Sequence, residues 1–255
     1  SPSAQHPLDP GLDWARQALA HIQAIRDYSC VLIKRERIGN ELVGPHRMAI
    51  KVRQDPFSVY LSYQSPSSFR GQEAIYVEGQ NNNKVIGHLT GMKHRLFGAV
   101  SLNPRGTIAM RGNRYPITDV GLKRMLERII EVGQVDRAHG PCQVQYRQAV
   151  IDGRSCSSME IVHPRQQPGF KYAKAIVYVD DRLEVPVRFE AYGWPESDGD
   201  ELPLIEEYTY TSLVLNPGFT DEDFSPHNPQ YGFMRRAGDR LVRDESSLRR
   251  TTMTE

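Results

Sequence analysis

The chain has 255 residues and a formal net charge of +1, with 39% hydrophobic and 25% charged residues. This composition is typical of a water-soluble globular protein and excludes wholesale disorder. No apolar run is long enough to predict a membrane-spanning helix, and the nearly balanced charge excludes a polycation that would bind nucleic acid. The three cysteines are too few for a disulfide framework.

The first predicted element is a helix over residues 9–26, after a loose, flexible arm over residues 1–8. Asp9 is a suitable N-cap, and Pro10 suits the first helical position. Apolar residues recur at helical spacing along one face of this segment. From Tyr28 onward the apolar period changes to two, which indicates a change from helix to strand.

Several strands are predicted next. Residues 28–53 form a hairpin that turns at residues 39–40, a Gly-Asn pair. Residues 57–63 alternate between apolar and polar side chains, which predicts a strand with one apolar face. Residues 74–77 and 84–89 predict a further antiparallel pair, joined by an asparagine-rich turn.

Residues 90–117 have no clear period but carry several apolar side chains between glycines and prolines. A loop of this length in a compact domain indicates either a functional lid or an unrecognised element.

A second helix is predicted over residues 119–132, capped by Thr118 and ended by Gly133. A second group of strands follows, with a two-residue turn at Asp152-Gly153. Its members are residues 142–150, 154–163, 172–179, 186–192 and 204–215. Residues 216–233 form a proline-rich closing segment, and residues 234–255 are predicted to be a disordered tail.

These elements predict a mainly β (α+β) protein. The expected architecture is a single strongly curved antiparallel sheet, or incomplete β-barrel, of about ten strands with two helices packed on its concave face. We expect one domain over residues 9–233, between the arm over residues 1–8 and the tail over residues 234–255.

The second group of strands has a distinctive order of turn and core positions. A strand ends at Asp180, Pro186 opens the next, and Asn216, Pro217 and Phe224 close the chain. This order resembles the closing half of the LolA/LolB-like group of periplasmic lipoprotein carriers and their outer-membrane receptor. The opening helix, followed by a hairpin that begins at Tyr28, is also similar (residues 12–53). The nearest relative this suggests is an uncharacterised bacterial envelope family related to those carriers.

The resemblance implies a non-enzymatic protein, exported to the periplasm or cell envelope after removal of a signal peptide. It implies a lipid or an acylated protein as partner and no cofactor, with the acyl chain held in an apolar cavity beneath the helices. The residues expected to line that cavity are Phe57, Val59, Leu61, Tyr63, Phe97, Leu122, Met125 and Ile129.

No catalytic, phosphate-binding or metal-binding motif occurs in the sequence. The spacing of His88 and His94 is more typical of ordinary polar residues than of metal ligands. If Asp152-Gly153 is a two-residue turn, Cys142 lies opposite His163 in the hairpin. A cysteine beside a histidine can act as a nucleophile, but buried packing is the commoner role of cysteine, so no enzymatic activity is predicted.

The charges are distributed unevenly. Residues 79–118 carry six Lys or Arg and no acid, whereas residues 189–234 carry ten acids and no Lys or Arg. Either the two segments are solvated faces that neutralise each other, or the basic segment is a lid that meets anionic headgroups or a membrane surface. On the second interpretation the headgroup contacts are Lys93, Arg95, Arg105 and Arg111.

Three classes of function therefore remain open. The first is a lipid or lipoprotein carrier, and the second is a structural or protein-interaction domain of the envelope with a filled barrel and no ligand. An apolar pocket of roughly a few hundred Å³ would favour the first. The third, an enzyme, would need His163, Cys142 and an acid within hydrogen-bond reach in a cleft. The sequence leaves the cargo and the oligomeric state open.

Overall fold

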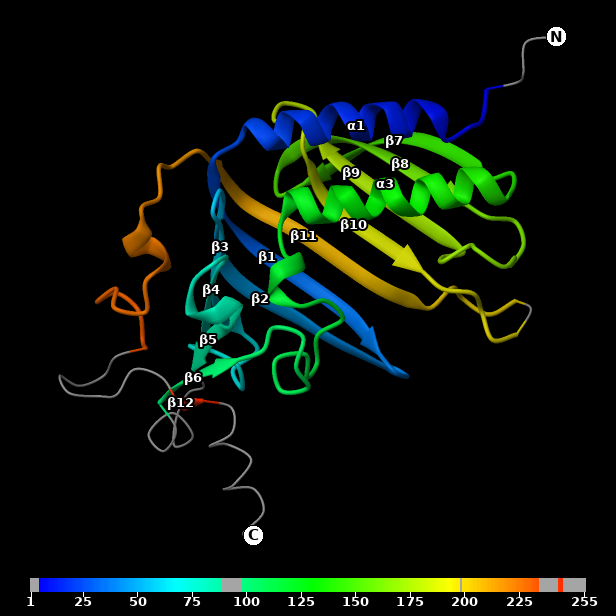
Figure 1. The fold of residues 1–255 in the computed structure, drawn as a ribbon. Coiled ribbons are helices and arrows are strands. Elements are labelled where there is room, and N and C mark those ends of the chain that lie inside the picture. The colour runs from blue at the N-terminus through cyan, green and yellow to red at the C-terminus, as the bar shows by residue number, and fades with distance from the viewer. Residues whose placement is uncertain (1–4, 89–97, 198, 234–242, 245–255) are drawn as a thin grey trace. The chain divides into compact units, whose positions relative to one another are not determined.

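The structure, a computed structural model, describes residues 5–88, 98–197, 199–233 and 243–244 (Figure 1). The chain divides into two compact units. The first comprises residues 1–24, 33–43 and 121–211, and the second comprises residues 25–32, 44–120 and 212–255. The expectation of one domain over residues 9–233 stays a prediction.

The protein is mainly β, as predicted, with one sheet that does not close on itself. The strands are β1 (Asp27–Ile38), β2 (Glu41–Gln54), β3 (Phe57–Ser65), β4 (Glu73–Val77), β5 (Val85–His88), β6 (Ala99–Leu102), β7 (Gln143–Ile151), β8 (Arg154–Val162), β9 (Lys174–Asp180), β10 (Pro186–Tyr192), β11 (Leu204–Leu215) and β12 (Arg243–Asp244). Their order is β12-β6-β5-β4-β3-β2-β1-β11-β10-β9-β8-β7. All are antiparallel except β12, which pairs with β6 in parallel.

Two strands, β6 and β12, have no counterpart among the predicted strands. β6 pairs with β5 and lies in the segment over residues 90–117, for which the sequence left a functional lid and an unrecognised element open. Four residues are too few to display an alternating pattern, which explains the error. The part of that segment over residues 89–97 lies outside the described residues, as does the predicted tail except for β12.

Among the described residues, the α-helices are α1 (Asp9–Ala24) and α3 (Leu122–His139). The predicted second helix was wrong at both ends. Thr118 lies in a short 3₁₀ turn, η2 (Ile117–Asp119), and Gly121 is the N-cap. Gly133 does not end the helix; a Cβ there would lie 2.9 Å from Leu12 Cδ2, so the glycine lets α1 and α3 pack closely.

In the first unit, both helices lie across strands β7 to β10 (Figure 1). A cluster of buried side chains joins α1 and the segment before it to β7 and β8. It contains Leu8, Leu12, Cys142 and Ile161, with Val144 and Met159 packed against them. A Cβ on Gly11 would lie only 2.4 Å from Met159 Sδ, so α1 sits directly on β8.

In the second unit, the closing segment over residues 216–233 packs against β3, β4 and β6. It contributes Phe224, Tyr231 and Phe233 to a buried cluster, and the strands contribute Tyr60, Ile75, Val77 and Ala99. The rings of Tyr60 and Tyr231 stack at 3.9 Å. Two ion pairs fix the 3₁₀ turn η3 (Asp221–Phe224) to β2, Lys51 with Asp223 and Arg53 with Asp221. The predicted proline-rich closing segment therefore has a defined place in the core.

Within the described residues, no helix has the length and apolar character needed to cross a membrane.

Candidate functional site

The sheet face that α1 covers can be followed from strand to strand. Met159, which packs with α1, lies opposite Val177 on β9, and Val177 lies opposite Phe189 on β10. Phe189 in turn lies opposite Tyr208 on β11. Because directly opposed residues share a face, Tyr208 points to the helix side. Glu206, two residues earlier on β11, points the same way.

Five buried polar side chains meet on this face and form what we call the helix-side polar network, namely Lys34, Glu36, Tyr172, Glu206 and Tyr208. Lys34 Nζ donates to Glu36 Oε2 at 2.7 Å, and the Tyr208 hydroxyl donates to Glu36 Oε1 at 2.6 Å. The Tyr208 hydroxyl also lies 3.3 Å from Glu206 Oε2, and Tyr172 donates to Glu206 Oε1. One hydrogen-bonded chain thus connects two carboxylates and an ammonium group.

This network is costly to bury. Lys34, Glu36 and Glu206 are only 7%, 3% and 2% exposed. Removing charges from water costs several kcal/mol each, and well-packed apolar residues in their place are often equally or more stabilising. The network is therefore not explained by stability alone, which makes it the strongest candidate for a binding role.

The sequence did not single out these residues. In β1 the side chains on the network's face are Cys30, Leu32, Lys34 and Glu36, so the charges continue an apolar alternation. Two charged residues at positions that continue an apolar alternation were the signal in the sequence that could have indicated this site. It could be recognised only once the pairing with Tyr208, 172 residues away from Glu36, was known.

The opposite face of β10 and β11 carries a separate ionic group. Arg188 Nε donates to Glu190 Oε1 at 2.6 Å, and Arg188 also pairs with Glu207 at 3.0 Å. Tyr192 donates to Glu190 Oε2 at 2.7 Å. Glu190 and Glu207 therefore pair with Arg188. Asp221 and Asp223, later in the acidic segment, pair with Arg53 and Lys51 of β2. The acidic segment is therefore neutralised at these positions by residues outside the basic segment.

A second buried pair joins α3 to the end of β8. His163 Nδ1 lies 3.0 Å from the carbonyl oxygen of Tyr172, which can only accept, so Nδ1 carries the proton. His163 Nε2 lies 3.4 Å from Asp136 Oδ2. Burial raises the pKa of Asp136 to about 6 and lowers the pKa of His163. In the neutral ring, two acceptor atoms therefore face each other unless Asp136 is protonated.

Cys142 lies beside this pair. The pairing of β7 with β8 confirms the register deduced from the Asp152-Gly153 turn, which continues to Cys142 and His163. Burial, and then the charge of Asp136, raise the pKa of Cys142 to about 11. A nucleophilic cysteine must be a thiolate, whereas this one stays a thiol at neutral pH and packs in the core. The arrangement gives the enzyme hypothesis no support.

The predicted cavity residues on α3 lie in the first unit. Leu122 and Met125 are 0% and 1% exposed, so no space the size of a water molecule borders them. Ile129 is half-buried. A ligand would reach these residues only after neighbouring side chains had moved.

The predicted cavity residues on β3 belong to the second unit. Val59 is fully buried, and Phe57, Leu61 and Tyr63 are half-buried. Phe97 lies outside the described residues.

Of the predicted headgroup contacts, Arg105 and Arg111 are exposed, whereas Lys93 and Arg95 lie outside the described residues. Arg105 pairs with Asp119 at 3.1 Å, so its charge is partly compensated.

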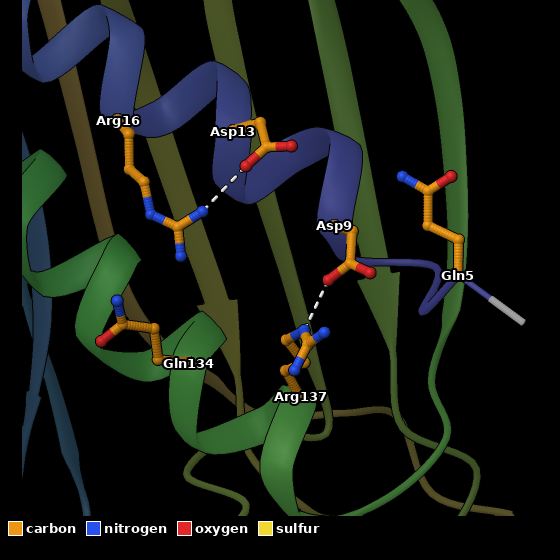
Figure 2. Close-up of a pocket in the computed structure, with 6 residues that line it drawn as sticks. All are labelled: Gln5, Asp9, Asp13, Arg16, Gln134 and Arg137. Atoms are coloured by element: carbon orange, nitrogen blue, oxygen red, sulfur yellow. Dashed lines mark hydrogen bonds and ion pairs between the residues drawn. The ribbon is translucent and has the colours of Figure 1, made fainter. Parts of the chain in front are cut away.

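A pocket of about 480 Å³ lies between α1 and α3 (Figure 2). Its lining consists of Gln5, Asp9, Asp13, Arg16, Gln134 and Arg137. Arg137 donates to Asp9 and holds the pKa of that carboxyl below its usual value, and Arg16 pairs with Asp13 at 2.8 Å. A lining made only of polar and charged groups does not suit an acyl chain.

The described residues contain no group of three or more His, Cys, Asp or Glu side chains that could hold a metal ion. His88 instead contacts Glu73, with His88 Nε2 2.6 Å from Glu73 Oε2. His94 lies outside the described residues.

Residues 25–233 match the model of a family described as "Protein of unknown function (DUF1571)". The chain belongs to this family. The match begins just after α1, so it contains the whole sheet except β12 and leaves out the first helix. No curated protein matches the sequence.

Solved structures similar to this DUF1571 chain include two lipoprotein-related proteins and a LolA superfamily protein. Lipoprotein LppX from Mycobacterium tuberculosis is 17% identical, with a TM-score of 0.46 over 83% of this chain and 98% of that one. A putative outer membrane lipoprotein-sorting protein domain from Vibrio parahaemolyticus is 12% identical, with a TM-score of 0.40 over 84% and 95%. A LolA superfamily protein from Nitrosomonas europaea is 13% identical, with a TM-score of 0.34 over 83% and 97%. The predicted membership of an uncharacterised family is confirmed by the family match, and a lipoprotein-sorting domain and a LolA superfamily protein are among the structures that the chain is similar to.

Proposed function

We propose that this chain is a non-enzymatic, exported binding protein whose ligand is a lipid or a lipidated protein. The observation that carries the proposal is the helix-side polar network on an otherwise apolar covered face. Ala191 lies opposite Glu206 and Phe189 lies opposite Tyr208 in the paired strands. An amphiphile needs apolar surface for its chain beside a few placed polar groups for its headgroup, and this face offers both.

The ligand would enter by displacing α3 from the sheet. Leu122 and Met125 are sealed against their neighbours, so the acyl chain takes the place of these side chains rather than filling an existing hollow. α3 packs against β10, next to the strand that carries Glu206 and Tyr208. Arg105 and Arg111 are exposed residues of the second unit, and as a separate proposal they contact an anionic headgroup or membrane surface there.

Two adjacent residues of β11 provide the test. Glu206 points to the helix side, whereas Glu207 points to the opposite face and pairs with Arg188. The purified protein is titrated with a fluorescent fatty acid and a fluorescent lysophospholipid. Native mass spectrometry records lipid that copurifies.

Glu206→Gln should raise the dissociation constant for the lysophospholipid at least about tenfold, because a hydrogen bond to a charged group contributes about 1.5–3 kcal/mol. Glu207→Gln should change it less than about twofold on the same scale. Circular dichroism at the assay temperature confirms that both variants are folded. Absence of binding by either probe, or equal effects of the two substitutions, would remove the support for this function.

The second candidate is a structural or protein-interaction domain of the envelope without a ligand. The sealed surroundings of Leu122 and Met125 favour it, because a filled core needs no cargo. The same titration separates the two candidates, since a filled protein binds neither probe.

A further inference from the structure

The edge of β7 is an open pairing surface. β7 stands at the end of the strand order and, among the described residues, is hydrogen-bonded only to β8. Most of its nine residues are exposed. Of the large hydrophobic side chains that the structure describes, Tyr146 and Val150 are the two most exposed, at 60% and 70%. Both have even numbers, so both lie on the same face of the strand.

Natural edge strands usually carry devices that prevent pairing, such as proline, lysine, a bulge or short length. β7 has none of these. Its sequence, QVQYRQAVI, has no proline or lysine, and its pairing with β8 runs without a register shift from Gln143 to Ile151. Arg147 is its one charged side chain. An unprotected edge of this length indicates that pairing with another strand has a use.

The backbone groups available on this edge follow from the hairpin. Ile151 and Arg154 flank the two-residue turn at Asp152 and Gly153, both of which have positive φ. Such a flanking pair is hydrogen-bonded, so odd-numbered residues of β7 direct their N–H and C=O groups to β8. The carbonyl of Arg147 accordingly accepts from Ser158 Oγ at 3.2 Å. The N–H and C=O groups of residues 144, 146, 148 and 150 therefore point outward.

We propose that β7 pairs antiparallel with β7 of a second copy of this chain, about a twofold axis through Gln148. In this register Tyr146 of each copy lies opposite Val150 of the other, and Gln148 lies opposite its own copy. Each of these pairs joins outward-facing residues and can exchange two backbone hydrogen bonds. Aromatic and β-branched residues are favourable cross-strand partners, and here they cover each other's exposed surface.

The charge of Arg147 favours the register with its axis at Gln148 over the register with its axis one residue earlier. A shift of the axis by one residue would place Arg147 directly opposite Arg147 of the other copy, and opposed like charges are destabilising. With the axis at Gln148, Arg147 lies opposite Ala149. Glu160 on β8 lies 4.0 Å from Arg147 and compensates its charge. A self-paired edge of this kind gives a closed twofold dimer rather than an open chain.

The test uses the full chain in sedimentation velocity experiments over a wide concentration range. The wild-type protein should dimerise reversibly. Val150→Lys should raise the dissociation constant at least tenfold, whereas Val214→Lys, at an exposed valine of β11, should leave it unchanged. Gln148→Pro removes an outward N–H and keeps every backbone hydrogen bond to β8, losing only the exposed side-chain bond to Ser157 Oγ, so it should abolish dimerisation while leaving the melting temperature close to that of the wild type.

The register has its own readout. In Gln148→Cys the two introduced thiols lie on directly opposed residues, within the Cα separation that a disulfide spans, so mild oxidation should give a covalent dimer. Gln145→Cys is the control, because residue 145 and its copy lie several residues apart and should not crosslink. A wild-type protein that stays monomeric throughout the range, or Gln145→Cys crosslinking as fast as Gln148→Cys, would overturn the proposal.

Discussion

Replacing Asp136 with asparagine should stabilise the protein at neutral pH. Burial raises the pKa of this carboxyl from 3.8 to about 6. Each pKa unit corresponds to about 1.4 kcal/mol, so ionised Asp136 costs the folded state about 3 kcal/mol. Because the pKa is raised in the folded state, this cost is absent below pH 3.8, grows as the pH rises and is complete above about pH 6. The asparagine has no such cost, and its amide can donate to His163 Nε2.

The assay is urea unfolding of both proteins from pH 4 to pH 8. The stability gained by Asp136→Asn should be below about 1 kcal/mol at pH 4 and about 3 kcal/mol at pH 7. His163 and His139 also face Asp136, and the burial cost of protonating His163 falls on both proteins at low pH. Asp13→Asn, which removes an exposed ion pair with Arg16 on α1, is the control and should change the stability by less than about 1 kcal/mol at either pH. A variant less stable than the wild type at pH 7 would show that Asp136 serves as an anion paired with protonated His163, and would refute the reasoning.

Two further substitutions test the core. Leu126→Asp places a charge at a fully buried position of α3 and should unfold the first unit. If the chain is a single domain, as predicted, calorimetry of this variant should show no unfolding transition at all. A transition that survives would show that the two units fold separately. Gly133→Val should cost about 1–3 kcal/mol because its Cβ meets Leu12. In thermal unfolding, the double variant with Leu12→Ala should lose less stability than the sum of the two single variants, and additive losses would contradict the proposed contact.

The parts of the fold that the sequence predicted are those with local signals. The Asp152-Gly153 pair, with positive φ at both residues, fixed the β7–β8 register to the residue, and the alternation of β1 and β2 fixed their hairpin. The helix end at Gly133 was wrong because glycine has two uses. It ends helices, and it also permits close packing; only the position of Leu12 on another helix decides between them.

The candidate site was harder to predict because the role of its residues depends on elements that lie far away in the sequence. Lys34 and Glu36 occupy inward positions of β1, but a strand's inward face is defined only by what covers it. Their partners come from β11 and from Tyr172, far away in the sequence. The count of charges in the two segments was correct, but it did not predict where the charges lie. Asp223, Asp221, Glu190 and Glu207 pair with Lys51, Arg53 and Arg188, which lie outside the basic segment.

Glu73 is expected to hold the closing segment on the second unit. Its Oε1 accepts from the Tyr60 hydroxyl at 2.8 Å, and its Oε2 accepts from the Gly232 amide and contacts His88 Nε2, both at 2.6 Å. Burial alone would raise the pKa of Glu73, but the hydrogen bonds from His88, Tyr60 and Gly232 outweigh it and hold the pKa below 4.5. The stabilisation is therefore present above pH 4.5 and is lost as the pH falls through the folded-state pKa.

In Glu73→Gln the charge is gone and one of the two acceptor atoms becomes a donor, which removes this acceptor either from the Tyr60 hydroxyl or from both Gly232 and His88. The free energy of unfolding should fall by about 2 kcal/mol or more at pH 7, since hydrogen bonds to charged groups contribute about 1.5–3 kcal/mol each. Limited proteolysis should cut the closing segment over residues 216–233 faster than in the wild type. Glu78→Gln, on an exposed residue just after β4, is the matched control and should leave both quantities unchanged. A Glu73→Gln protein with wild-type stability and unchanged cleavage would mean that aromatic packing around Tyr231 holds the segment without help from the carboxylate.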